Sequence, residues 1–187
     1  MVLVRLKYGL GLVGAFGHLL VACGSGDSNN TVDYSKVELA INELQASNQS
    51  TAYDEANEAD DWFEVYNPSK TKQALTSFYV SDDPSNPTKY QMPEGVTVPA
   101  GGVVIIWADG TPAQGSNHLP FKLSAAGESV LISDPTGALL DTVDYVTAPG
   151  AGQSFARHPD GTGTFQWCAT PTPGALNSDV CAAAPVP

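Results

Sequence analysis

Turn-forming residues recur at short intervals along most of the chain, and this spacing is the strongest constraint on its fold. Proline, glycine, asparagine, aspartate and serine stand together at Asn67–Ser69, Asp82–Pro84, Pro99–Gly102, Asp109–Gly110, Asp134–Gly137 and Asp160–Gly161. These residue types start tight turns or accept a positive φ. The intervals suit short strands better than long helices, so the pattern predicts an all-β sandwich or barrel.

The apolar residues between these turns alternate with polar ones, as they do in strands with one buried face. The alternating sets are Val37 with Leu39 and Ile41, Phe63 with Val65, Phe78 with Val80, Val130 with Ile132, Val143 with Tyr145, and Phe165 with Trp167. Val103–Trp107 is apolar throughout, which favours a central strand covered on both faces and leaves a short buried helix open. Two sheets packed face to face would bury all these side chains.

The first 22 residues have the organisation of an export signal. Arg5 and Lys7 precede a short apolar run, and Leu20, Val21, Ala22 and Cys23 resemble the lipobox of bacterial lipoproteins. We expect cleavage after Ala22, lipid on Cys23, and a flexible tether over residues 23–35. The alternative is an apolar N-terminal helix in a cytoplasmic protein, which His18 favours.

Removing that signal takes away two basic residues and no acidic ones, so the formal net charge changes from −12 to −14. Such an acidic chain repels phosphate backbones, and we therefore expect no nucleic-acid binding. The remaining length fits one domain.

Two cysteines remain once Cys23 is assigned to lipid. We expect Cys168 and Cys181 to form a disulfide that holds the C-terminal tail, residues 178–187, against the last strand. Two free thiols are the alternative. The spacing of these cysteines lacks the second pair of ligands that a zinc site needs.

Several segments in order resemble a lamin-tail domain. They are Val37–Leu44, Asp61–Ser69, Leu75–Asp82, Val98–Gly102, Phe121–Ser124 before Gly127-Glu128, Leu139–Tyr145, Ser154–Gly161 and Thr172–Asn177. The sequence departs from the pattern at Ser77-Phe78, where relatives often carry Gly-Trp. The resemblance implies an immunoglobulin-like β-sandwich over residues 36–177, in an exported or surface protein.

A cluster of acids precedes the second predicted strand. Asp54, Glu55, Glu58, Asp60 and Asp61 form a candidate calcium site, because calcium favours several oxygen ligands from one loop. Their spacing is not that of an EF-hand, and a solvated acidic turn is the alternative. The neighbouring turn could add Asp82 and Asp83 if the two loops meet.

Asp141 falls on the same strand face as Leu139, Val143 and Tyr145. A carboxylate on an apolar face needs a partner, and we expect Arg157 to supply it in a structural ion pair.

No catalytic constellation is expected. Ser154, His158 and Asp160 lack the context of a nucleophile elbow, and a serine and a histidine four residues apart in a strand are too far apart for proton transfer. His118 and His158 have no partner at metal-ligand spacing, which argues against a histidine-rich zinc site.

These observations predict a non-enzymatic binding or scaffold module, anchored by lipid to the bacterial cell envelope at the outer membrane or cell surface. Its partner would be an unknown protein or glycan. A calcium-dependent adhesion or carbohydrate-binding module is the alternative. Trp62 and Tyr66, opposite Phe63 and Val65, would form an adhesive patch if exposed, or would pack beneath a loop or sheet edge.

Overall fold

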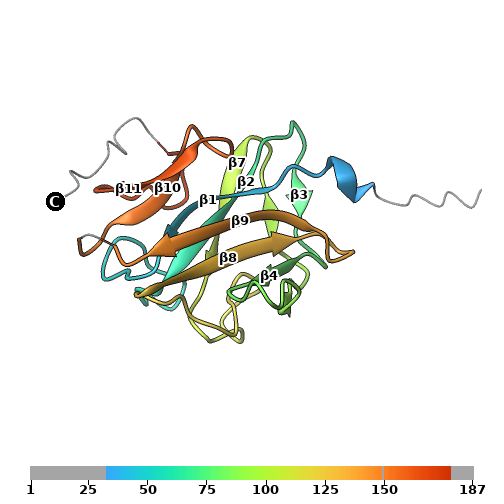
Figure 1. Ribbon diagram of the computed structural model, residues 1–187. Helices are drawn as coiled ribbons and strands as arrows, with labels where there is room; N and C mark the ends of the chain where they lie inside the picture. The colour runs from blue at the N-terminus through green and yellow to red at the C-terminus, as the bar shows by residue number, and fades with distance from the viewer. Residues whose placement is uncertain (1–32, 149, 178–187) are drawn as a thin grey trace, which may run out of the picture. The chain divides into compact units, whose positions relative to one another are not determined.

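The computed structural model describes residues 33–148 and 150–177, which form an antiparallel β-sandwich (Figure 1). The first sheet has the order β11 (Thr164–Cys168), β10 (Ser154–His158), β1 (Ala40–Gln45), β2 (Trp62–Asn67) and β7 (Gly102–Trp107). The second has the order β5 (Tyr90–Gln91), β4 (Tyr79–Ser81), β8 (Gly127–Ser133) and β9 (Leu139–Val146). A separate ladder joins β3 (Gln73–Ala74) to β6 (Thr97–Val98). The only helical element in these ranges is a 3₁₀ turn, Tyr34–Lys36, so the predicted fold class is confirmed.

The core lies between the inner faces of the two sheets, where β1 packs against β8 and β9 (Figure 1). Most of the predicted alternating residues fill it, together with side chains from the connecting loops. The predicted pair of Phe165 and Trp167 is an exception: both side chains are half-buried, and only Phe165 packs against the core. Fully buried members include Ile41, Leu44, Phe63, Val65, Leu75, Phe78, Val80, Ile106, Leu119, Val130 and Ile132. Burial of this apolar area is the main stabilising contribution to the fold.

Two β-bulges change which residues face the core. In β1 the register skips Asn42, so Ile41 and Leu44 both point inward while Glu43 points outward. In β9 the register skips Leu140, which places Leu139 on the opposite face from Asp141. The prediction that Leu139 shares the core face was therefore wrong, and its side chain is 52% exposed.

Val103–Trp107 does form a strand, β7, but the prediction of a central position was wrong, because β7 is the edge of its sheet. Its outward side chains Val103 and Ile105 are only half-buried. They line a groove instead of packing into a second core.

Trp62 and Tyr66 do not form an open patch. Trp62 is fully buried, and its indole N–H donates to Gln45 Oε1 at 3.0 Å. Gly161 lies directly against the Tyr66 ring, where an added Cβ would stand 2.5 Å from Cδ1. Gly161 also has φ of +66°, so both the conformation and the close approach require glycine.

The expected signal, the lipidated Cys23, most of the tether and the tail 178–187 lie outside the described residues. Within the described ranges, no helix has the length and apolar character needed to cross a bilayer.

Candidate functional site

A groove runs along the outer side of the edge strand β7. Its volume is about 450 Å³, and its floor is formed by residues of that strand, Val103, Val104, Ile105 and Trp107, of which Val103, Ile105 and Trp107 direct their apolar side chains outward. Three other parts of the chain complete its lining: the segment Tyr53–Glu55, Asn117, and Gly174. Apolar floors with a few polar groups at the margin are typical of binding sites.

The groove wall at residues 53–55 is held by a buried asparagine. Asn48 donates from Nδ2 to the carbonyls of Ala52 and Asp60, at 2.7 and 2.9 Å, and its Oδ1 accepts from Thr51 N. These bonds fix both ends of the loop between β1 and β2. Tyr53 is thereby presented at the groove with 53% of its surface exposed.

A buried histidine lies behind the groove floor. The His118 side chain is 1% exposed, and its ring is stacked with that of Trp107, with ring centroids 6.3 Å apart. Nδ1 stands 2.7 Å from Asp109 Oδ2, and Nε2 stands 3.2 Å from Glu55 Oε2. Burial alone would lower the pKa of His118, but the hydrogen bonds to Asp109 and Glu55 outweigh it and the pKa is raised.

The predicted calcium ligands divide into separate environments. Oxygens of Asp54, Glu58 and Asp60 lie within 4.8 Å of one another, whereas Glu55 faces His118. Asp61 Oδ1 instead accepts from Asn48 N, and burial raises the pKa of Asp61 to about 6. Among the described residues, neither Asp82 nor Asp83 belongs to a set of side chains that could bind a metal. Asp82 forms an ion pair with Lys89, and Asp83 accepts a hydrogen bond from Ser85.

A second set of potential metal ligands consists of Asp54, Asp109 and His118, and this set was not predicted. Its members come from loops more than 50 residues apart, and the sequence offers no local spacing that would reveal them.

The family model of the Lamin Tail Domain matches residues 33–147. The chain belongs to this family. No curated protein is similar enough to the chain to count as a relative. Family membership indicates an immunoglobulin-like binding or scaffold module. The first sheet of this lamin-tail domain continues beyond the matched range through β10 and β11.

The outer face of the lamin-tail domain's first sheet conceals two acidic residues. Glu43 and Glu64 are directly opposite each other on β1 and β2, and both are fully buried. A segment that we call the strap, residues 172–177, covers them. Thr172 donates from N and Oγ1 to Glu43, and Gly174 N donates to Glu64 Oε1.

The strap is fixed by its last residue, Asn177. Its Nδ2 donates to the carbonyls of Asn42 and Arg157, and its N–H donates to Asp160 Oδ1. Asp160 Oδ1 also accepts from Asn42 Nδ2, so the bulge in β1 is the anchor for the strap.

Burial, followed by the repulsion of Glu43, raises the pKa of Glu64 to about 9. Burial also raises the pKa of Glu43, although Ser154 and Thr172 oppose this by donating hydrogen bonds. At neutral pH Glu64 is therefore protonated, which removes the charge repulsion that two opposite carboxylates would otherwise suffer. This buried pair was missed because alternation alone predicts a solvated outer face.

The structure brings Asp141 and Arg157 together. Arg157 Nη2 lies 2.8 Å from both carboxylate oxygens of Asp141, and the guanidinium stands 4.4 Å from the Phe165 ring centroid. Asp141 lies on β9 and Arg157 on β10, so the pair connects the two sheets.

Ser154 is held away from any nucleophilic arrangement, because its hydroxyl donates to the buried Glu43 carboxylate. Cys168 ends β11 in a fully buried position, while Cys181, the other half of the predicted disulfide, lies outside the described residues.

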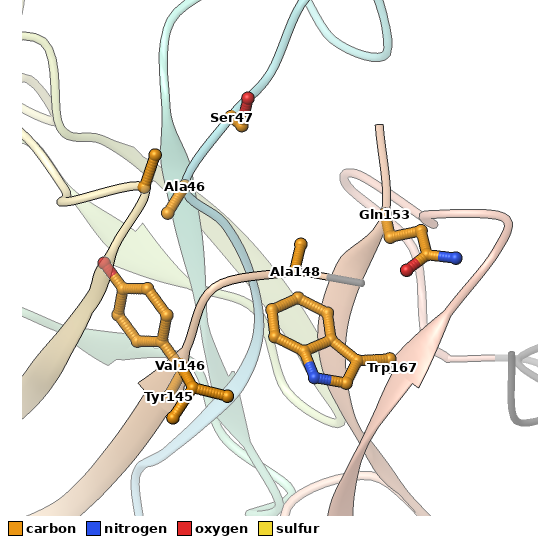
Figure 2. A pocket seen from close by; sticks show the side chains of 8 residues that line it. Ala46, Ser47, Tyr145, Val146, Ala148, Gln153 and Trp167 are labelled. Carbon is orange, nitrogen blue, oxygen red and sulfur yellow. The ribbon is translucent and has the colours of Figure 1, made fainter. Parts of the chain in front are cut away.

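A second, much smaller hollow lies between the loop after β1 and the end of β9. Figure 2 shows Ala46, Tyr145 and Val146 on one side and Trp167 with Gln153 on the other. Its volume of about 10 Å³ has room for about one water molecule. It is too small for an organic ligand, so the groove along β7 is the better candidate site.

Proposed function

We propose that this protein is a lipid-anchored, non-enzymatic binding module that the bacterial envelope presents to a protein or glycan partner. The observation that carries the proposal is the groove along β7, in which an edge strand of an immunoglobulin-like domain exposes apolar side chains beside an aromatic one. The outer membrane or cell surface is the location that fits the lipobox-like sequence ending at Cys23.

The composition of the groove supports binding rather than catalysis. Val103 and Ile105 provide apolar area, and Tyr53 provides a ring with a polar end, which is a combination common in recognition surfaces.

Lipid attachment is tested by metabolic labelling in a bacterial host with an alkyne-tagged fatty acid. We expect the full-length protein to take up the label and the Cys23→Ala variant to take up none. Mass spectrometry should then place the mature N-terminus at Cys23. An unlabelled protein that retains residues 1–22 would contradict the anchor.

The groove is tested by a photo-crosslinking amino acid in place of Tyr53, introduced into the full-length protein in intact cells. We expect a discrete adduct whose partner mass spectrometry identifies, because Tyr53 is exposed at the groove margin. The same amino acid at the exposed Lys70 is the matched control. No adduct at position 53, or the same adducts at both positions, would count against the groove as the binding surface.

A calcium-dependent adhesion or carbohydrate-binding module is the second candidate. The oxygen group of Asp54, Glu58 and Asp60 favours it, since calcium prefers oxygen ligands. Calorimetry with calcium separates the candidates, because absence of heat and of a thermal shift at millimolar calcium removes the second.

A further inference from the structure

Three side chains that could bind a metal converge behind the groove floor. Asp54, Asp109 and His118 each offer one ligand atom, and these atoms all lie within 4.8 Å of one another. Asp54 belongs to the loop between β1 and β2, whereas Asp109 and His118 belong to the loop that follows β7. Two structurally separate loops are therefore needed to assemble the set.

One oxygen of this set lacks a partner. Asp54 Oδ1 accepts from Glu58 N at 2.7 Å, but Oδ2 is inaccessible to solvent and has no hydrogen-bond partner within the described part of the chain. A buried carboxylate oxygen is destabilised unless a hydrogen-bond donor or a cation compensates it.

The set also carries uncompensated negative charge. Asp54, Glu55 and Asp109 surround one imidazole, and none of these three carboxylates forms an ion pair with a lysine or arginine in the described residues. If His118 is protonated, its single positive charge still leaves the three carboxylates with an excess of negative charge. That excess lies beside the His118 side chain, which is only 1% exposed. A divalent cation would neutralise this excess.

We propose that the lamin-tail domain binds one divalent transition-metal ion, with Asp54, Asp109 and His118 as ligands and with Nδ1, the ring nitrogen that faces Asp109, as the histidine donor. An imidazole together with carboxylates suits Zn²⁺ or its first-row neighbours, whereas calcium sites are built from oxygen alone. A metal at Nδ1 would take the place of the proton that the 2.7 Å contact with Asp109 can hold, while Nε2 would keep its N–H and donate it to Glu55 at 3.2 Å.

The site adjoins the binding groove. Asp54 and Glu55 line the groove themselves, and Trp107, which is part of its floor, is stacked with the His118 ring. Metal binding would fix the wall of the groove at residues 53–55. The metal proposal depends only on the ligand cluster, so it survives if the groove proves to have no partner.

Calorimetry of the untagged full-length protein in detergent, titrated with ZnCl₂ and separately with CaCl₂, tests the site. We expect one Zn²⁺ per chain, a higher melting temperature with Zn²⁺, and no competition from an equal concentration of Ca²⁺. Asp54→Asn should weaken Zn²⁺ binding at least tenfold, and so should His118→Gln. The asparagine retains the oxygen that accepts from Glu58 N, which preserves the loop.

Two control variants separate this site from others. His158→Gln removes the other histidine of the described domain, and Glu58→Gln removes a member of the all-oxygen group; both should retain Zn²⁺ affinity. Circular dichroism and metal-free melting temperatures establish that Asp54→Asn is folded. Absence of Zn²⁺ binding, or wild-type affinity in folded Asp54→Asn, would overturn the proposal. Preferential Ca²⁺ binding that Glu58→Gln abolishes would overturn it in favour of the oxygen group.

Discussion

Replacing Glu64 with glutamine is expected to stabilise the protein at alkaline pH and to flatten the dependence of its stability on pH. Glu64 is fully buried opposite Glu43, and its Oε2 has no hydrogen-bond partner among the described residues. Its pKa is raised from 4.5 to about 9, chiefly by burial. Glutamine keeps an oxygen for the N–H of Gly174 and cannot acquire a charge.

The direction follows from proton binding in the two states. Below pH 4.5 the carboxyl is protonated in both the folded and the unfolded chain, so its contribution to stability is fully present. Between pH 4.5 and about 9 only the folded state keeps the proton, and the free energy of unfolding therefore falls as pH rises. The slope approaches about 1.4 kcal/mol per pH unit.

Urea denaturation between pH 5 and pH 8 measures the effect. We expect the wild-type protein to lose about 2 to 4 kcal/mol more than Glu64→Gln over this range, since each pKa unit corresponds to about 1.4 kcal/mol. Glu38→Gln, at an exposed position, should leave the wild-type slope unchanged. Equal slopes for the wild-type protein and Glu64→Gln would refute a neutral, buried Glu64.

Local sequence patterns were sufficient for most of the fold. Alternation at Phe63 with Val65 and at Val130 with Ile132 reflects one buried strand face, and each pair does lie in the core. The bulges at Asn42 and Leu140 could not be predicted, because a skipped residue depends on the partner strand. The exposure of Leu139 is the consequence.

The candidate site was less predictable, because it depends on long-range packing. The acidic loop at Asp54 was visible in the sequence, but its contact with His118 joins residues 64 positions apart. Glu43 and Glu64 occupy outward positions that alternation assigns to solvent, and only the strap makes them buried. The ion pair of Asp141 could be predicted, since a carboxylate on an apolar face requires a partner wherever that partner lies in the sequence.

Removing Asp141 is expected to destabilise the fold by about 2 to 4 kcal/mol, because it leaves a largely buried guanidinium without its counter-ion. The side chains of Arg157 and Asp141 are 16% and 18% exposed. Their role extends beyond mutual attraction, since they bind the backbone of Ile41 at the bulge. Ile41 N donates to Asp141 Oδ2, and Arg157 Nε donates to Ile41 O, both at 2.8 Å.

These two bonds replace strand pairing that the bulge interrupts. The ladder between β1 and β10 includes Glu43 and Leu44 but not Ile41, so Asp141→Ala leaves a backbone N–H without its acceptor as well as an unpaired charge. The lost hydrogen bond and the unpaired charge both lower the free energy of unfolding. The loss should appear as a lower denaturation midpoint with the slope unchanged.

Asp144→Ala is the matched control, because Asp144 is an exposed residue of the same strand whose hydrogen bond is to Ser129 on the surface. Its removal should change the unfolding free energy by no more than about 0.5 kcal/mol. Asp141→Asn retains an acceptor for Ile41 N while losing the ionic attraction, so it should fall between the wild-type protein and Asp141→Ala. If Asp141→Ala and Asp144→Ala are equally stable, the pair does not hold the two sheets together.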